Sequence, residues 1–222
     1  MIKMYLKLDE KLSARFPGLE AKIIHLEGVS VAKENKELEQ YKDEVAQRIK
    51  SRWTVEELKD HPMIRAYRDF FWRLDIDPTK NRPAAEALIR RVLRERPLYK
   101  INTFVDAYNL VSMDTAVPIA SFDNDILVGE LYMREALEGE EFLGIGMKKP
   151  VTLKGGEAVI QDDEKLVAIY PYRDADSSKV GLTTRNVLML MCGAPGVETS
   201  ILDVAGNVSV EVMTRFCGGT VA

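Results

Sequence analysis

The sequence contains little histidine and cysteine, and this scarcity limits the chemistry that its side chains can support. Among its 222 residues are two histidines, His25 and His61, and two cysteines, Cys192 and Cys217. No C-x-x-C spacing occurs, so the sequence predicts neither a disulfide framework nor a zinc site, and a reducing cytoplasm suits it. So few histidines also disfavour a histidine-dependent nucleophile and a histidine-bound metal.

Long apolar runs and phosphate-binding loops are missing as well. No stretch approaches the ~18 consecutive apolar residues of a membrane-spanning helix. The opening MIKMYLKLDEKLSARF lacks the apolar run of a signal peptide. The patterns GxGxxG, GxxxxGKS/T and GxSxG do not occur. We therefore expect a cytoplasmic protein without a membrane partner, a cofactor or a metal.

What the sequence does contain is a local block of positive charge. The net charge of the chain is −4, which is the wrong sign for a protein that coats nucleic acid nonspecifically. Segment 80–100 nevertheless carries Lys80, Arg82, Arg90, Arg91, Arg94, Arg96 and Lys100 against Glu86 and Glu95. A basic face over this segment is therefore compatible with the acidic total.

Hydrophobic periodicity predicts an α+β protein with its helices largely first and a mixed sheet later. We expect helices over 34–51, after Thr54 (with Glu57 as its capping-box partner), after Pro62, after Pro83, over 103–116, and over 197–216. We expect strands over 3–8 and 21–31, and in the later runs ILVGELYM, PVTL, EAVIQ, LVAIY and NVLMLM. Segment 75–83 is a loop or a domain boundary.

Two polar segments are candidates for chemistry. The adjacent acidic residues 162–164 are more typical of a hairpin turn than of a metal site. The stretch YPYRDADSSKVGLTTR, residues 170–185, follows a predicted buried strand. It could bind an anion or an amino-acid ester through hydroxyls, backbone N–H groups and one guanidinium. Alternatively, Arg173 and Asp174 only organise a long turn.

Four motifs in order carry a resemblance to a known family. INTFVDAYNLVSMDTAVPIASFDND resembles the start of the B3/B4 domain of the phenylalanyl-tRNA synthetase β subunit, with matches at Asn102, Val105, Asp106, Asn109, Pro118, Phe122 and Asp123. GELYMREALEGEEF resembles the next family motif, with matches at Arg134, Ala136, Gly139 and Glu140. A strand–acidic turn–strand unit and SSKVGLTTRNVLML follow in the family order, over roughly 83–217.

The resemblance implies one α+β module with a cleft, in which a helical N-terminal part packs on a mixed sheet. We expect a single domain over 1–222, made of an N-terminal extension (1–82) and a B3/B4 core (83–217). Because the synthetase subunit is several times longer, the chain looks like a free-standing B3/B4 protein and not a full tRNA ligase. DPTKNRPAAEALIRRVL is similar to a hallmark of the free-standing members, which usually have serine where Ala84 stands.

Two departures from the family bear on activity. In the bacterial synthetase the cleft hydrolyses mischarged tyrosyl-tRNA, but its histidine is replaced here by Ala120. The glutamate that recognises the tyrosine hydroxyl falls near Lys179. Tyrosine-specific editing is therefore not carried over.

The resemblance implies a protein that binds tRNA or aminoacyl-tRNA, and it leaves open whether the protein hydrolyses mischarged aminoacyl-tRNA in trans. We expect substrate contacts from Asn102, Asn109, Ser121, Arg134, Arg173, Asp174, Thr183 and Thr184, and RNA contacts from Lys80, Arg82, Arg90, Arg91 and Arg94. In a purely structural alternative, Asp106 and Asn109 stabilise a helix end and a turn, and Arg134 forms an ion pair. The alternative function is a binder of, or enzyme for, an amino-acid-like small molecule without RNA. Convergence of Arg173, Thr183 and Ser121 on one pocket would support the site.

Overall fold

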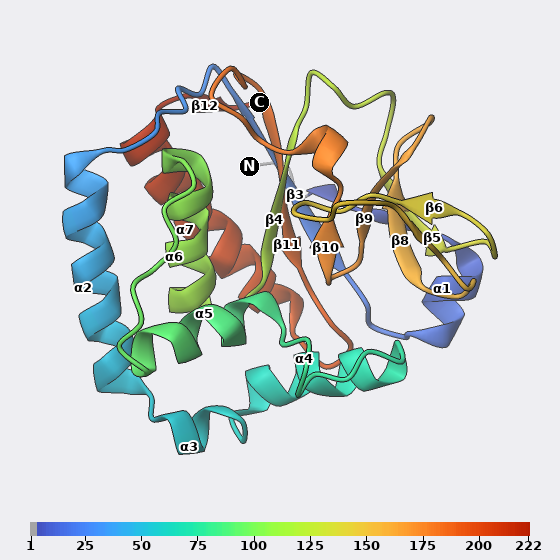
Figure 1. The fold of residues 1–222 in the computed structure, drawn as a ribbon, viewed down its shortest axis with the longest axis horizontal. Coiled ribbons are helices and arrows are strands. Elements are labelled where there is room, and N and C mark those ends of the chain that lie inside the picture. The colour runs from blue at the N-terminus through green and yellow to red at the C-terminus, as the bar shows by residue number, and fades with distance from the viewer. Residues whose placement is uncertain (1–3) are drawn as a thin grey trace.

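The computed structural model describes residues 4–222, which form a helical layer, a central sheet and a second sheet. In Figure 1 the central sheet runs down the middle, with most helices on one side and the second sheet on the other. The helices are α1 (Glu10–Arg15), α2 (Lys36–Arg52), α3 (Val55–Leu58), α4 (Pro62–Arg73), α5 (Ala84–Leu93), α6 (Thr103–Thr115) and α7 (Thr199–Cys217). A short 3-10 turn, η1, spans Asp176–Ser178.

The two main sheets join strands from distant parts of the chain. The central sheet has the order β1 (Met4–Tyr5), β3 (Ala21–Glu27), β11 (Val187–Cys192), β4 (Ile119–Asp123), and β12 (Thr220–Val221) also pairs with β3. The second sheet has the order β10 (Arg173–Asp174), β9 (Leu166–Ile169), β8 (Ala158–Gln161), β5 (Tyr132–Glu135), β2 (Lys7–Leu8). β6 (Glu141–Phe142) pairs with β7 (Val151–Thr152). The β2–β5 pairing is parallel and its neighbours are antiparallel, so the second sheet is mixed, as predicted.

The core lies on both faces of β11. All six residues of this strand are buried, because helices cover one face and the second sheet covers the other. On the helical side, α7 presents a buried stripe that includes Leu202, Ala205 and Ser209 at helical spacing. The segment is therefore a helix, although it is rich in valine, which favours strands. Gly206 allows the close approach, since a Cβ there would lie 3.1 Å from Cδ1 of Ile24. The predicted α+β class is confirmed.

Several predicted strands were too long, for local reasons. The predicted strand 3–8 is divided at Leu6 into β1 and β2, which join different sheets, and residue 3 lies outside the described part. β3 ends at Glu27 because Gly28 has a left-handed backbone, with φ of 70°. Of ILVGELYM, only Tyr132 and Met133 lie in a strand, since the backbone turns at Gly129 (φ 71°).

The strand predicted over 21–31 is present as β3, and it belongs to the N-terminal third. β3 lies inside the central sheet, between β1 and β11, so this third supplies a core strand as well as a helical layer. The short elements α1, β6, β10 and β12 had no clear sequence signal. Thr54 caps α3 by accepting the N–H of Glu57 at 3.3 Å, as predicted. Within residues 4–222, no helix combines the length and the apolar character needed to cross a bilayer.

Candidate functional site

A pocket of about 160 Å³, which we call the Asp174 pocket, lies between the two sheets and the start of α5. Its walls come from six parts of the fold: α5, α6, β4, β8, the β9–β10 hairpin and β11. The lining residues are Ala84, Tyr108, Asn109, Pro118, Ile119, Ala120, Ile160, Ala168, Ile169, Tyr170, Pro171, Tyr172, Arg173, Asp174, Leu190 and Cys192. Asn109, Pro118 and Ala120 belong to the motif that carried the resemblance, so this pocket occupies the place where a cleft was expected.

Local sequence explains how polar groups reach this apolar space. Asn102 caps α6 by accepting the N–H of Val105 at 2.9 Å, which sets the helix register that places Tyr108 and Asn109 at the pocket. β10 is held by antiparallel pairing with β9, and the N–H of Ile145 donates to the carbonyl of Asp174 at 2.9 Å. A strand pinned on both edges therefore presents the Asp174 side chain.

Asp174 is the chemically distinctive group in the pocket. Within residues 4–222, no hydrogen bond or ion pair joins its carboxyl group to another side chain or to the backbone. Burial raises the pKa of this carboxyl to about 7, against a smaller lowering effect of the Arg173 charge. Because the residue is partly accessible through the pocket, a ligand or water can reach it. The group can therefore gain or lose a proton near neutral pH.

Asn109 and Arg173 add hydrogen-bonding groups to the same pocket. The Asn109 side chain makes no hydrogen bond within the described residues, so its amide is free for a ligand. One guanidinium nitrogen of Arg173 donates to the carbonyl of Ile145 at 2.8 Å, and its Cζ lies 5.1 Å from the centre of the Tyr172 ring. The remaining Arg173 donors are available to an anion or a carbonyl.

Tyr108, Tyr170 and Cys192 were missed by sequence reasoning. The Tyr170 hydroxyl donates to the carbonyl of Gly193 at 2.7 Å and is structural. Burial raises the pKa of the Cys192 thiol and of the Tyr108 phenol far above neutrality, so both stay protonated. Neither residue had a recognisable sequence signal. The thiol of Cys192, for example, ends the apolar run NVLMLMC, which is typical of a core strand.

Every residue predicted to contact RNA lines one concave basic area. This arginine surface has a depression of about 220 Å³ and is formed by Lys80, Arg82, Ala87, Arg90, Arg91, Arg94 and Arg96. Beneath it the carboxylate of Glu86 is fully buried, with Arg90 at 2.8 Å and Arg68 at 3.5 Å. One carboxylate cannot neutralise so many guanidinium groups. The surface therefore keeps a positive potential suited to a polyanion.

The arginine surface and the Asp174 pocket share α5. Ala84, in the first turn of α5, lines the pocket, and Ala87, three residues later on the same helix face, lines the basic depression. The two features are thus about one helical turn apart, a rise of roughly 5 Å. A single extended ligand can reach both.

The other predicted substrate residues lie elsewhere or serve the framework. Asn102 also donates to the carbonyl of Val180 at 3.3 Å. Arg134 forms an ion pair with Glu140 at 2.6 Å, as the structural alternative predicts. The buried Thr184 hydroxyl donates to Oδ2 of Asp123 at 2.6 Å. None of these three lines the pocket.

The expected convergence of Arg173, Thr183 and Ser121 on one pocket does not occur. Ser121 is buried on β4 and interacts with the Tyr108 phenol, one residue removed from the pocket wall. Thr183 is exposed and lies outside the lining. The reason is the alternation of strand side chains and the turn at Gly181–Thr184, which sends successive residues to different sides. Of the eight predicted residues, Asn109, Arg173 and Asp174 meet.

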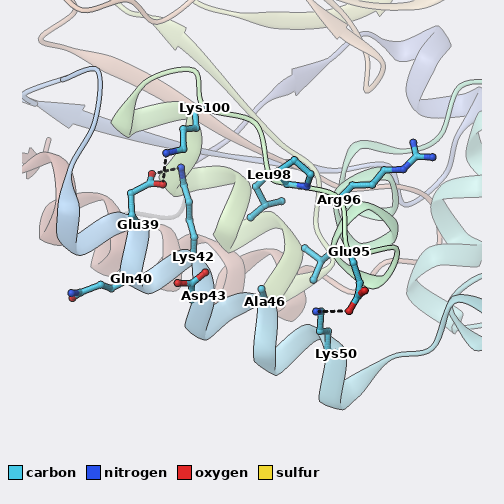
Figure 2. Close-up of a pocket in the computed structure, with 12 residues that line it drawn as sticks. Glu39, Gln40, Lys42, Asp43, Ala46, Lys50, Glu95, Arg96, Leu98 and Lys100 are labelled. Atoms are coloured by element: carbon cyan, nitrogen blue, oxygen red, sulfur yellow. Dashed lines mark hydrogen bonds and ion pairs between the residues drawn. The ribbon is translucent and has the colours of Figure 1, made fainter.

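Figure 2 shows a larger groove of about 550 Å³ between α2 and segment 95–100. Its charged side chains neutralise one another: Glu39 pairs with Lys42 at 2.6 Å and with Lys100 at 2.9 Å, and Lys50 lies 3.4 Å from Glu95. Arg96 extends away from these pairs in the view. The groove is therefore large but holds its charges in mutual contacts, and it is a weaker candidate.

The described residues contain no group of three or more His, Cys, Asp or Glu side chains placed to hold a metal ion. His61 caps α4, where its Nδ1 accepts the N–H of Met63 at 3.3 Å, and His25 lies on β3. Neither histidine lines the Asp174 pocket. The pocket offers the carboxyl group of Asp174, the amide of Asn109 and the guanidinium of Arg173.

Comparisons with known proteins agree with the fold. A family model described as the B3/4 domain matches residues 66–217. The phenylalanine–tRNA ligase beta subunit of Fusobacterium nucleatum is 34% identical over 97 residues, covering 44% of this chain and 12% of that protein. The corresponding subunit of Mycoplasma genitalium is 27% identical over 107 residues, covering 48% and 13%.

A solved structure extends the likeness to the N-terminal third. It is a crystal structure of an N-terminal fragment of the phenylalanyl-tRNA synthetase beta subunit from Pyrococcus horikoshii. The match has a TM-score of 0.50 at 17% identity and covers 97% of this chain and 49% of that one. At this identity the likeness concerns the fold alone. The chain spans only an eighth or so of the full-length curated relatives.

Proposed function

The chain belongs to the B3/4 domain family, and from that premise we propose that it binds aminoacyl-tRNA and hydrolyses the ester of mischarged aminoacyl-tRNA in trans. The observation that carries the proposal is the shared helix: α5 borders the Asp174 pocket at Ala84 and the arginine surface at Ala87. An aminoacylated RNA end has the same two parts, a small ester group joined directly to a chain of phosphates.

The arginine surface supports the binding step. Its guanidinium groups suit phosphate oxygens, and such contacts are sequence-independent and sensitive to salt. Arg94 and Arg96 have no ion-pair partner within residues 4–222, so they keep their donors for a ligand. This local charge makes RNA binding compatible with the net charge of −4.

The Asp174 pocket supports the aminoacyl step. Its β4 and β11 wall is apolar, with Ile119, Ala120 and Leu190, and would receive a small or apolar side chain. Asn109 and Arg173 supply donors for the ester carbonyl. An aminoacyl ester is already activated, so oriented water and fixed donors can accelerate its hydrolysis without a histidine.

The pocket does not carry the tyrosine specificity of the bacterial editing site. Ala120 lines the wall where the family histidine is missing, and Lys179 pairs with Asp176 at 2.7 Å outside the pocket. With about 160 Å³ available, the pocket suits a compact aminoacyl group better than a bulky aromatic one.

The test is deacylation of a panel of mischarged tRNAs, each labelled in its amino acid, under single-turnover conditions. We expect acceleration of at least one tRNA–amino acid pair. A variant that fills the pocket mouth, Ala84→Leu, should slow hydrolysis, and Ala14→Leu on the distant α1 is the matched control. No acceleration with any pair would overturn the hydrolase proposal.

A second candidate is an amino-acid-like small-molecule function without RNA. The acidic net charge and the small pocket favour it. tRNA affinity measured against salt separates the two. An RNA binder that uses several phosphates weakens steeply as salt rises, whereas a small zwitterionic ligand shows little dependence.

A further inference from the structure

We propose that the Asp174 carboxylate is the general base of the hydrolysis, taking a proton from the attacking water and passing it to the leaving ribose oxygen. The inference rests on the proposed function and gives it a specific catalytic residue. It is based on two observations: the backbone of Asp174 is held by hydrogen bonds, and its carboxyl group has no protein partner within the described residues.

Two nearby carboxylates, those of Asp176 and Asp162, are committed to structural partners. Asp176 accepts from Lys179 at 2.7 Å. Asp162, in the β8–β9 turn, accepts from the N–H groups of Glu164 and Lys165 at 2.9 and 2.8 Å. The Asp174 carboxyl has no such partner in residues 4–222, although Arg173 is paired within β10 and the N–H of Ala175 donates to the carbonyl of Val167 at 2.8 Å. A carboxylate that lines a pocket and has no protein partner keeps its oxygens for a ligand or for water.

The groups that face Asp174 leave it as the titrating group of the pocket. Arg173 lies on the same strand, Tyr108 faces it from α6, and Cys192 faces it from β11. Burial raises the pKa values of Tyr108 and Cys192 far above neutrality, so they add no charge at pH 7. The carboxyl pKa of about 7 gives Asp174 the base strength at which general-base catalysis near neutral pH is efficient.

The step balances as follows. The Asp174 carboxylate removes one proton from water as the water oxygen bonds to the ester carbonyl carbon. Asn109 and Arg173 donate to the oxyanion that forms. When the intermediate collapses, the bond to the ribose oxygen breaks, and the protonated Asp174 returns the proton to that oxygen. The products are the free amino acid and the tRNA hydroxyl, with the carboxylate restored.

The experiment compares Asp174→Asn with the matched variant Asp176→Asn, two residues along the same segment. Single-turnover deacylation of the best tRNA pair is followed from pH 5.5 to 8.5, with uncatalysed hydrolysis subtracted at each pH. We expect the wild-type rate to rise through about pH 7 and then level off. The deacylation rate of Asp174→Asn should be about 100-fold or more below wild type, which is the usual scale of general-base catalysis, and it should no longer rise through pH 7. Asp176→Asn should keep both.

Binding and titration separate this role from a structural one. The tRNA Kd of Asp174→Asn should stay within about twofold of wild type, and carboxyl-labelled NMR should show one group near pH 7 that the variant lacks. A wild type that deacylates while Asp174→Asn keeps its rate and pH profile overturns this inference and leaves the proposed function standing. A wild type that deacylates nothing overturns both. An Asp174 signal that titrates near pH 4 overturns the inference whatever the activity.

Discussion

The ammonium of Lys42 on α2 lies 2.7 Å from Oδ2 of Asp106 on α6, and both side chains are almost fully buried. The other oxygen of Asp106 accepts the N–H of Ile101 at 2.9 Å. This ion pair joins the N-terminal third to the start of the motif that resembles the family. Asp106 therefore has a structural role, as the structural alternative predicts.

Removing one partner of this pair should be costly. Asp106→Ala removes the buried partner of the Lys42 ammonium, which then keeps only Glu39 at 2.6 Å, and it leaves the N–H of Ile101 unpaired, so we expect the free energy of unfolding to fall by about 1–3 kcal/mol. Chemical denaturation measures this loss. Asp43→Ala, on the exposed face of α2 next to Lys42, should change the free energy of unfolding by less than ~0.5 kcal/mol. We also propose that residues 1–82 and 83–217 unfold as one domain. Separate transitions for the two parts would contradict that.

Thr183 and Thr184 should respond differently to the same change. The Thr184 hydroxyl donates to Asp123 and accepts the N–H of Gly181 at 2.9 Å, so Thr184→Val removes a partner from the buried Asp123 carboxylate and from the partly buried Gly181 N–H. We expect a loss of roughly 1–3 kcal/mol in stability. Thr183→Val, on an exposed side chain, should be nearly neutral. Equal melting temperatures for the two variants would argue against the framework role of Thr184.

The salt dependence of tRNA binding should report the arginine surface. Arg94 lines the depression without an ion-pair partner in the described chain, so Arg94→Ala removes one of the proposed phosphate contacts and no ion pair. We expect weaker binding and a drop of about 1 in the slope of log K against log salt. Lys11→Ala on α1, across the central sheet from α5, is the control of equal charge. An unchanged slope for Arg94→Ala would place the RNA elsewhere.

Stability should depend on pH through Asp174. Its folded-state pKa of about 7 is raised above the ordinary value, so the folded protein binds the proton more tightly and loses stability as pH rises from about 4 to 7. Asp174→Asn lacks this loss and should exceed wild type at pH 8 by on the order of 2–4 kcal/mol, with the advantage vanishing near pH 4. Denaturation at both pH values measures it. A more stable and less active variant is the expected trade-off for a functional carboxyl.

The helices could be predicted from sequence because their signals are local. The apolar spacing of α2, α4 and α5 and the cap at Thr54 each lie within one or two turns of chain. The buried stripe of α7 differs from the one that its spacing of Ile201, Val204 and Val208 suggests, since Val204 is 58% exposed. The short strands β6, β10 and β12 could not, since a strand of two residues exists only through its partner on another segment. The division of residues 4–8 between two sheets is decided in the same way.

The site was predictable in part for the same reason. A polar loop with Arg173 and Asp174 after a buried strand is visible in sequence, as is the basic segment that became the arginine surface. Which of the neighbouring polar residues face one space depends on strand alternation and on a turn, so Thr183 and Ser121 separated from Arg173. Tyr108 and Cys192 reach the pocket only through packing.

By itself, the sequence determined the family, the α+β class and the local concentration of basic residues, because motif order, periodicity and charge are written along the chain. The tertiary structure alone decided that Asn109 and Asp174, 65 positions apart, face one pocket, and that α5 joins this pocket to the arginine surface. It also decided the protonation behaviour of Asp174, since a carboxyl pKa depends on which groups surround it and how far water is excluded.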